Sequence, residues 1–250
     1  MASSHVEEET EPKKYLLIFD FDETLVDQDS EYGIANMILS KEEYHKIVEW
    51  DKIDYYDTFN YFFKRLKEMG LTLEDYDKYL EKLELSPGMK ELFNYLRQNK
   101  SKYEMIILSG DIDYSIKHIL KYHGFLDLFD HFILNRCQIQ PETSERLIFV
   151  PRDQFPHKCN LCISSQCKGL ELKKYLEEKG EKYNKIIFVC DGGNDFCHSK
   201  KILRKGDIIF PRVEHGLCKK LFEQNLRNEL VCDVYPWKSA DEIISKLKEI

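Results

Sequence analysis

Residues 15–26 read YLLIFDFDETLV, an apolar run that ends in two aspartates separated by one residue. Successive side chains of a strand point to opposite faces, so Asp20 and Asp22 at the carboxyl end of such a strand point the same way. Open α/β sheets bind ligands beyond the carboxyl ends of their strands, which is where this pair lies if Leu16 to Phe19 is a buried parallel strand. The pair therefore predicts a site at which two carboxylates act on one substrate atom.

Apolar runs typical of buried strands recur along the chain. They lie at Leu16 to Asp20, Met105 to Ser109, Phe132 to Leu134, Ile186 to Cys190 and Ile208 to Phe210, with helical patterns between several of them. Strands that alternate with helices predict an α/β fold, a doubly wound parallel sheet covered on both faces. In the weakly periodic stretch at 136–166 we expect a short hairpin around Leu147 to Val150, followed by an irregular loop.

The segment from about residue 30 to residue 85 breaks this alternation. Its helical patterns lie at Glu31 to Trp50, Tyr55 to Met69 and Leu73 to Leu83, the last with Thr72 as N-cap, and it contains no clear strand. The sequence Ser-Pro-Gly at 86–88 then marks the return to the sheet. We expect a catalytic α/β core at 14–29 and 86–250, a helical cap over the site at 30–85, and a disordered tail at 1–13.

Composition narrows the class of protein. The 250 residues can bury a full core, and the apolar fraction of 42% and charged fraction of 33% are typical of soluble globular proteins. The net charge of −8, without a basic stripe, argues against a nucleic-acid partner. No apolar stretch approaches the roughly 20 residues of a membrane span. Residues 1–13 resemble neither a secretory signal nor a transit peptide, and eight cysteines then suggest reduced thiols. We expect a cytoplasmic protein; its oligomeric state stays open.

Four polar motifs lie at the predicted boundaries of strands or helices. They are the pair Asp20 and Asp22, Ser109-Gly110 after an apolar run, Lys168 before a helical pattern, and CDGGND at 190–195. Each alone is explained by a cap or a turn. Their joint occurrence in this order favours a functional site.

Lys168 has an argument of its own. A cation in the first turn of a helix lies against the positive end of the helix dipole, which is unfavourable unless an anion is bound there. A phosphate group would supply that anion. The alternative is a solvated lysine on an irregular loop.

The order DFDET, LSG, Lys and DGGND resembles the haloacid dehalogenase superfamily, in particular its phosphohydrolases with a helical cap between the first two motifs, over Tyr15 to about Pro211. Within it, FDFDETLVD, HKCNLCISSQCKG, VCDGGNDFC and the late Pro236-Trp237 are similar to the orphan-phosphatase family of phosphoethanolamine/phosphocholine and pyridoxal-phosphate phosphatases. The resemblance implies a Rossmann-like core that hydrolyses a small phosphorylated metabolite.

The resemblance also implies a role for each motif. Asp20 is expected to be the nucleophile that forms an aspartyl-phosphate, and Asp22 the acid that protonates the leaving oxygen and later takes a proton from water. Ser109 and the Gly110 amide are expected to bind phosphate oxygens. Lys168 is expected to neutralise the charge shared by the nucleophile and the phosphate.

Magnesium is the cofactor that this resemblance implies. Its expected ligands are the Asp20 carboxylate, the Asp22 backbone carbonyl and Asp191. Asp195 is expected to support the metal or Lys168 indirectly.

Two positions depart from the family pattern. The family typically has Ser-Asp at the second motif, and that acidic residue, together with one matched here by Glu31, is associated with recognition of the substrate's amino group. Here Gly110 takes that place, followed by Asp111 and Asp113. Because Glu31 keeps its charge, we expect cationic or ring-nitrogen substrates, with pyridoxal phosphate slightly ahead of phosphoethanolamine because Gly110 leaves more room. The second departure is CISSQCK at 162–168, where the family usually reads Cys-Pro-x-Asn-Met-Cys-Lys.

The expected function is therefore magnesium-dependent hydrolysis of a small phosphomonoester. Two alternatives stay open. One is a phosphotransferase or phosphomutase that uses the same aspartyl-phosphate. The other is a non-catalytic module that binds a phosphorylated metabolite or zinc.

A cysteine-rich stretch precedes Lys168. His157, Cys159, Cys162 and Cys167 are ligand types that can form a Cys3His zinc site, and C-x2-C is a common half-site. However, all four come from eleven residues, and no distant second half-site is obvious. We therefore favour a buried thiol-rich loop, with structural zinc and a redox role as the alternatives.

Overall fold

The computed structural model describes residues 15–40, 43, 55–139, 147–150, 157–162, 166–180 and 183–250. The predicted tail at 1–13 and most of the predicted helix beyond residue 40 lie outside these residues, so those predictions stay untested. Within the described elements, a few side chains also lie outside the description, namely those of Glu31, Tyr32, Asn36, Tyr55, Tyr56 and Phe149.

The described strands form one sheet in the order β4-β3-β2-β1-β5-β6-β7. The central strand β1 (Tyr15–Phe19) pairs in parallel with β2 (Tyr103–Ile112) and with β5 (Lys185–Cys190). The outer parallel strands are β3 (His131–Ile139), β6 (Ile208–Pro211) and β7 (Asp233–Val234). The predicted α/β fold with a parallel sheet is confirmed, with one difference: β4 (Leu147–Val150) runs antiparallel to β3 at the edge.

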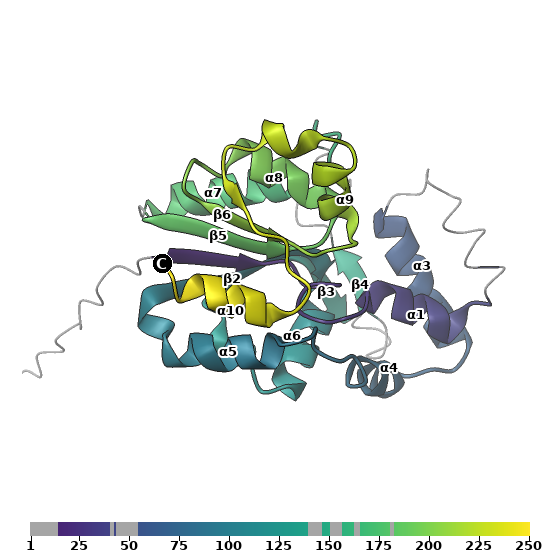
Figure 1. Cartoon of the computed structure of the whole chain (residues 1–250). Helices are drawn as coiled ribbons and strands as arrows, with labels where there is room; N and C mark the ends of the chain where they lie inside the picture. The colour runs from purple at the N-terminus through teal and green to yellow at the C-terminus, as the bar shows by residue number, and fades with distance from the viewer. Residues whose placement is uncertain are drawn as a thin grey trace, which may run out of the picture.

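Helices cover both faces of this sheet, as Figure 1 shows. One layer contains α5 (Met89–Gln98), α6 (Asp113–Tyr122) and α10 (Ala240–Leu247). The opposite layer contains α7 (Lys168–Lys179), α8 (Phe196–Lys201) and α9 (Gly216–Phe222). Short 3₁₀ turns lie at Lys100–Lys102, Leu126–Leu128, Gly193–Asp195 and Leu226–Glu229. Among the described residues, no helix has both the length and the apolar character that a bilayer crossing requires.

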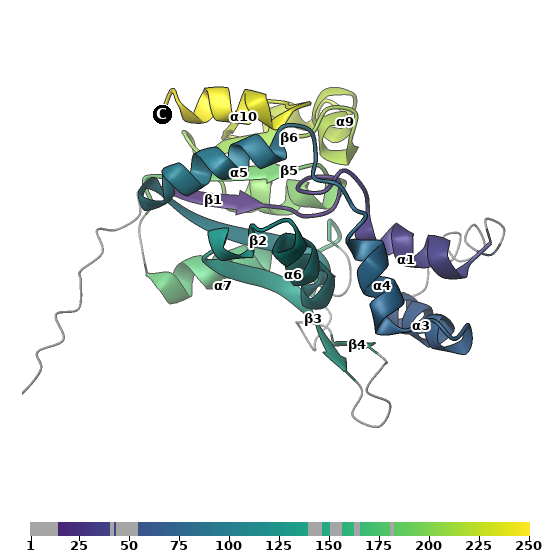
Figure 2. The same ribbon diagram turned by 90° about the horizontal axis from the view of Figure 1, so that it is seen from below.

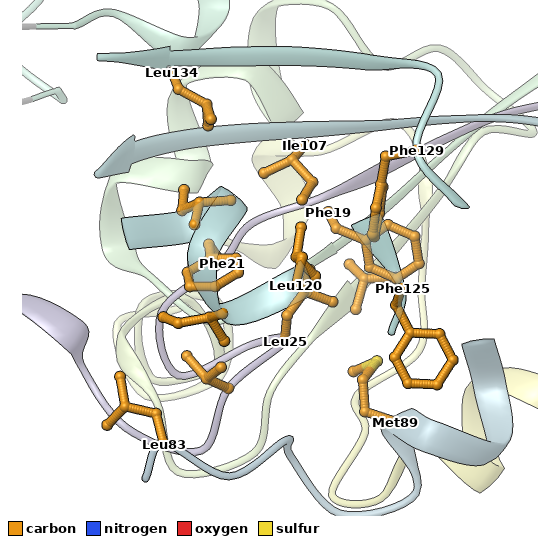
Figure 3. Close-up of a cluster of buried hydrophobic side chains, with 14 of the residues drawn as sticks. Phe19, Phe21, Leu25, Leu83, Met89, Ile107, Leu120, Phe125, Phe129 and Leu134 are labelled. Carbon is orange, nitrogen blue, oxygen red and sulfur yellow. The ribbon is translucent and has the colours of Figure 1, made fainter. Parts of the chain in front are cut away.

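Successive side chains of β1 point to opposite faces of the sheet, so they belong to two separate hydrophobic clusters, one under each helix layer. Leu17 and Phe19 belong to the cluster under α5, α6 and α10, whereas Leu16 and Ile18 belong to the cluster under α7, α8 and α9. All four side chains are fully buried, as expected for a strand covered on both faces. Figure 3 shows Phe19 beside Phe129 in the first cluster, where their rings meet edge to face at 5.9 Å. The aspartates that follow β1 are therefore carried by one of the most deeply buried strands of the molecule.

Three further helices lie beyond the carboxyl ends of the strands (Figure 2). They are α1 (Ser30–Ile38), α3 (Tyr55–Glu68) and α4 (Leu73–Leu80). Helix α4 begins at Thr72, which forms a capping box with Asp75, as the sequence predicts. It packs on the core through Tyr76, whose hydroxyl is 2.7 Å from Ser115 Oγ in α6.

The two ends of this helical segment lie side by side. An isolated antiparallel bridge joins Val26 to Leu85, and backbone N–H groups of Asp27 and Ser86 donate across it to Glu84 and Leu25. The segment thus leaves and rejoins the sheet domain at one paired crossing. This geometry suits a unit that moves relative to the sheet, although its predicted role as a cap stays a prediction.

Candidate active site

A pocket of about 180 Å³ opens at the carboxyl ends of β1, β2 and β5. This volume is below the roughly 300–1,000 Å³ of sites for drug-sized ligands, so it suits a small metabolite. Most of the residues that the sequence assigns to the site meet here. The pocket is lined by Asp20, Asp22, Glu23, Asp29, Ser109, Gly110, Asp111, Lys168, Asp191, Gly192 and Asn194.

Lys168 is the first residue of α7, and its amine lies between two carboxylates. Nζ is 2.5 Å from Asp20 Oδ2 and 2.7 Å from Asp195 Oδ1, and the lysine side chain is 3% exposed. Burial alone would lower the pKa of Lys168, but Asp195 and Asp20 together raise it above its ordinary value. The amine is therefore held as a cation against the predicted nucleophile.

Asp195 lies behind Lys168 and does not line the pocket. Its second carboxylate oxygen accepts from the Gly192 backbone N–H at 3.0 Å. Burial, with the neighbouring Asp20 charge, raises the pKa of Asp195. The geometry agrees with the prediction that Asp195 supports Lys168.

Asp22 faces the pocket with a different environment from Asp20. Burial raises the pKa of the Asp22 carboxyl well above its ordinary value, and the nearby charges of Asp111 and Asp29 raise it further. The Ser30 backbone N–H donates to Asp22 Oδ1 at 2.8 Å and opposes this only in part. A carboxyl group whose pKa is raised in this way suits a general acid.

An irregularity in β2 shapes the phosphate side of the pocket. Leu108 pairs with Ile133 and Ile112 pairs with Asn135, so three residues of β2 lie opposite one residue of β3. The resulting bulge contains Ser109, Gly110 and Asp111, all of which line the pocket. The sequence places the chemistry at Ser109-Gly110 but gives no sign of this bulge.

The bulge also supplies a carboxylate where the sequence pattern suggests that one is missing. Gly110 lacks the acidic side chain of the family pattern, yet Asp111, one residue later, lines the same pocket. Its Oδ2 accepts from Ser30 Oγ at 2.7 Å, and burial raises its pKa to about 7. Asp29 adds a further carboxylate to the lining. The pocket therefore retains anionic groups near its predicted phosphate-binding end.

Asp191, at the end of β5, is held by residues that the sequence motifs did not single out. Thr24 Oγ1 donates to Asp191 Oδ1 at 3.1 Å, and His215 Nδ1 lies 3.6 Å from Asp191 Oδ2 and 3.4 Å from Glu23 Oε2. Asp191 in turn raises the pKa of His215. Thr24 belongs to the DET motif and could have been found there, whereas His215 lies before α9 with no local signal.

The donor set fits a hard divalent cation. Carboxylate oxygens of Asp20, Asp191 and Asp195 lie within 4.8 Å of one another, and so do ligand atoms of Glu23, Asp191 and His215. Because Asp20 and Asp191 line the pocket and Asp195 does not, Asp20 and Asp191 are the better placed ligands. Among the lining residues, six carboxylates face one lysine, and a divalent cation would offset this excess of negative charge.

Two other predicted groups have different outcomes. The backbone of Glu31 lies in α1, but its side chain is outside the described residues, so its predicted contact with substrate stays untested. In the cysteine-rich stretch, the structure groups three cysteines with a fourth cysteine rather than with His157. Cys159, Cys162 and Cys167 gather around Cys197, while His157 Nδ1 accepts from the Cys159 backbone N–H at 3.2 Å.

Comparison with known sequences gives a consistent result. Residues 15–250 match the family described as "Putative Phosphatase". A pyridoxal phosphate phosphatase of Bos taurus is 32% identical over 241 residues, which cover 94% of this chain and 98% of the relative. A phosphoethanolamine/phosphocholine phosphatase of Gallus gallus is 29% identical over 248 residues, which cover 96% of this chain and 90% of the relative.

Solved structures with the same fold include phosphoserine phosphatases. A substrate-bound phosphoserine phosphatase complex superposes with a TM-score of 0.60 at 20% identity, covering 94% of this chain and 99% of the other. A phosphoserine phosphatase with an analogue of the phospho-aspartyl intermediate gives a TM-score of 0.59 at 19% identity, with the same coverage. At this identity the likeness establishes the fold alone.

Proposed function

Because this chain belongs to the "Putative Phosphatase" family and is a phosphoric monoester hydrolase, we propose that it acts as a phosphatase of the haloacid dehalogenase type and removes phosphate from small metabolites that carry an amine or a ring nitrogen. Pyridoxal phosphate and phosphoethanolamine or phosphocholine are the leading candidates. We further propose that the reaction depends on Mg²⁺ and passes through an aspartyl-phosphate.

In this mechanism Asp20 is the nucleophile. An Asp20 carboxylate oxygen forms a bond to phosphorus while the bond from phosphorus to the leaving oxygen breaks. Asp22 gives its proton to that leaving oxygen, for which its raised pKa prepares it. Water then attacks phosphorus, Asp22 takes a proton from this water, and the Asp20 carboxylate and inorganic phosphate are released.

The other side chains hold charge during these steps. Lys168, fixed by Asp20 and Asp195, neutralises negative charge as the phosphoryl group approaches the nucleophile. Ser109 and the Gly110 amide, in the β2 bulge, bind nonbridging oxygens.

Asp20, Asp191 and the Asp22 backbone carbonyl are the proposed ligands of Mg²⁺. When bound, the ion supplies Lewis-acid polarisation of the phosphoryl oxygens and lowers the repulsion between the phosphate and the carboxylates. Thr24 and His215 orient the Asp191 carboxylate toward the pocket through its two oxygens.

The helical segment at 30–85 is proposed as a cap over this pocket. Its helices α1, α3 and α4 lie beyond the strand ends, and it rejoins the sheet at the bridge between Val26 and Leu85. Closure of such a unit would exclude bulk water and limit access to small substrates.

The single observation that carries the substrate class is the acidic character of the pocket beyond Asp20. Asp29 and Asp111 line it, and one lysine lies among the lining residues. A cationic amine or a protonated ring nitrogen next to the phosphate would pair with these carboxylates, whereas a neutral sugar would leave them unpaired. The relatives named for pyridoxal phosphate and for phosphoethanolamine/phosphocholine support the same class.

A phosphate-release screen tests this proposal. Pyridoxal phosphate, phosphoethanolamine, phosphocholine and phosphoserine are compared with neutral sugar phosphates in the presence of Mg²⁺. The cationic and ring-nitrogen substrates should give the higher kcat/KM. If sugar phosphates lead, or if an isomer forms without free phosphate, the proposal is wrong.

Asp111→Asn tests the residue that carries the preference. It should raise KM for phosphoethanolamine several-fold, an effect on the order of 1 kcal/mol, and leave KM for a sugar phosphate nearly unchanged. The matched control is Asp113→Asn, because Asp113 lies outside the pocket lining and pairs with Lys117 at 3.4 Å. Equal changes in KM for both substrates would mean that Asp111 does not set the preference for a cationic substrate. The same comparison with Glu31→Gln tests the contact expected from the sequence.

A further inference from the structure

A group of four cysteines lies beside the active site but plays no part in the chemistry proposed above. The sulfur atoms of Cys159, Cys162, Cys167 and Cys197 all lie within 4.8 Å of one another. They come from three segments: the turn at 157–162, the residue before α7, and the second residue of α8. The fold thus brings together thiols that are up to 38 residues apart in sequence.

The spacing of these sulfur atoms suits one tetrahedral ion. A zinc–sulfur bond of about 2.3 Å with tetrahedral angles places the sulfur atoms about 3.8 Å apart. Cys197 Sγ is 3.4 Å from Cys159 Sγ and 3.8 Å from Cys167 Sγ. The ligand set of four thiolates, without carboxylate or imidazole, is typical of structural zinc.

A disulfide explains this arrangement less well. A sulfur–sulfur bond of about 2.05 Å joins one pair and leaves the other two thiols without a reason to converge. Cys197 approaches both Cys159 and Cys167, and it can bond to only one of them. A shared ion satisfies all four sulfur atoms at once.

The residues around the four cysteines include a cation that can stabilise negatively charged sulfur. Lys201 Nζ lies 3.5 Å from Cys159 Sγ, so a cation is available to offset the net negative charge of four thiolates around a divalent ion. Gly169 lies against the cluster, and a Cβ atom at this position would be 2.9 Å from Cys197 Sγ. The first turn of α7 therefore approaches the sulfur atoms as closely as the backbone permits.

We propose that Cys159, Cys162, Cys167 and Cys197 bind one structural zinc ion. Binding converts the four thiols to thiolates and releases their protons, with no change of oxidation state. The ion joins the turn at 157–162 to the beginnings of α7 and α8. It is distinct from the proposed Mg²⁺ site, whose ligands are oxygen atoms.

The position of this zinc gives it a role in holding the active site. Cys167 directly precedes Lys168, and Cys197 follows Asp195 by two residues. Lys168 and Asp195 form the buried ion pair behind Asp20. Zinc would therefore fix the position of Lys168 relative to Asp195. The importance of this for catalysis rests on the function proposed above.

Metal analysis of the full chain tests the proposal directly. Protein purified in reducing buffer without chelators should contain about one zinc ion per chain by mass spectrometry. Protein produced with cobalt should show a thiolate-to-cobalt charge-transfer band, which oxygen ligands do not give. Absence of both zinc and this band would overturn the proposal. If denatured protein has two free thiols fewer than the eight cysteines of the sequence, and peptide mapping finds both missing thiols among these four cysteines, a disulfide occupies the site instead.

Variants assign the ligands. Cys197→Ser should lower the zinc content at least several-fold, while His157→Ala should keep it. Cys218→Ser is the matched control, because Cys218 is also buried but lies in α9 outside the group. Asp191→Asn should also keep the zinc, which separates this site from the carboxylates. Retention of zinc in Cys197→Ser with loss in His157→Ala would contradict the assignment.

If Cys197→Ser does not fold, the wild-type chain still decides the question. Titration with a mercurial reagent should release zinc in step with modification of the four thiols. Release should occur together with a lower melting temperature. Modification of the thiols without zinc release would also overturn the proposal.

Discussion

Lys168 and its two carboxylate partners illustrate how single residues set the chemistry. Asp20 and Asp195 keep the buried amine charged, and the amine in turn holds the carboxylate of Asp20, the proposed nucleophile, through a hydrogen bond. Asp22, two residues from Asp20, has the opposite environment, because burial and the charges of Asp111 and Asp29 favour its protonated form. Two aspartates of one motif are thus prepared for different tasks.

Substitutions of these aspartates should separate their roles. Asp20→Asn should abolish turnover while the chain stays folded, because the amide keeps the shape but cannot attack. Asp22→Asn should reduce hydrolysis of alkyl phosphates by roughly 10²–10⁴-fold and affect activated aryl phosphates much less, since their leaving groups need little protonation. Steady-state kinetics with both substrate types checks this. Equal losses for alkyl and aryl substrates would count against Asp22 as the general acid.

Glu104 gives a residue-scale prediction about stability. This carboxylate of β2 is 4% exposed and accepts hydrogen bonds from Tyr175 and from Tyr183 at 2.9 Å, with Lys179 Nζ 3.0 Å away. Burial alone would raise the pKa of Glu104, but these partners outweigh it and lower the pKa below the ordinary 4.5. Its stabilising contribution is therefore present above about pH 4.5 and is lost as the pH falls through the lowered pKa.

Glu104→Gln should consequently lower the free energy of unfolding by about 1–3 kcal/mol at neutral pH. The difference from the wild type should shrink as the pH falls below the ordinary pKa of glutamate. Urea unfolding at several pH values measures it. Glu177→Gln is the control, since Glu177 is an exposed glutamate of α7, the helix that also contains Tyr175 and Lys179. A loss that does not vary with pH would exclude this charge as its cause.

The sequence predicts the residues at strand ends better than those in converging loops. Asp20, Ser109 and Asp191 each follow a clear apolar run, Lys168 precedes a helical pattern, and the structure brings all four to one pocket. Cys197 and His215 carry no such signal. Their positions depend on how α8 and α9 fold back over the sheet, which local periodicity does not encode.

At the scale of elements, local periodicity again predicts the long buried strands and misses the short features. Strands β1, β2, β5 and β6 were predictable because each contains a continuous apolar run that is buried on both faces. The predicted hairpin at Leu147 to Val150 corresponds to β4, which pairs antiparallel with β3. The two-residue strand β7 and the bulge in β2 were not predicted, because such short features have no periodicity to read.

Helix α5 meets the C-terminal helix α10 at Gly88, and this contact gives a prediction at the element scale. Gly88 has φ of +73°, and a Cβ atom there would be 2.6 Å from Ser239 Oγ and 3.0 Å from the Ala240 backbone nitrogen. Gly88→Ala should therefore destabilise the chain in two ways. The left-handed conformation costs about 1 kcal/mol for alanine, and the displacement of the start of α10 adds to it.

Gly70→Ala separates these two effects. Gly70 has the same φ of +73°, but no atom lies within 4 Å of the position that a Cβ atom would take there. Gly70→Ala should cost about 1 kcal/mol, and Gly88→Ala clearly more, in thermal or urea unfolding. Equal losses for the two variants would mean that α10 does not pack on α5 as described.

At the scale of the whole molecule, the proposed magnesium requirement can be tested without any substitution. Activity should disappear on chelation and return with Mg²⁺, whereas Ca²⁺ should inhibit, because it favours more and longer bonds to oxygen and would misplace Asp20. Phosphate release at a fixed substrate concentration measures this. Full activity in excess chelator would remove Mg²⁺ from the mechanism.

Variants then locate the ion. Asp191→Asn should raise the Mg²⁺ concentration needed for half-maximal activity more than Asp195→Asn does. The reason is that Asp195 is occupied by Lys168 and Gly192, whereas Asp191 faces the pocket. The reverse order would assign the ion to Asp195.

The register of the central strand has a consequence for how the chain reaches its native state. Tyr15 of β1 lies beside Lys185 of β5, so one neighbour of the first strand is synthesised 170 residues later. During translation Asp20, the proposed nucleophile, emerges early but remains without its partners, since Lys168 and Asp191 are still to be made. Contacts between such distant parts of a chain slow folding. The nascent protein must keep an apolar strand half-paired until β5 emerges, and an unpaired apolar strand edge is prone to aggregate during that delay.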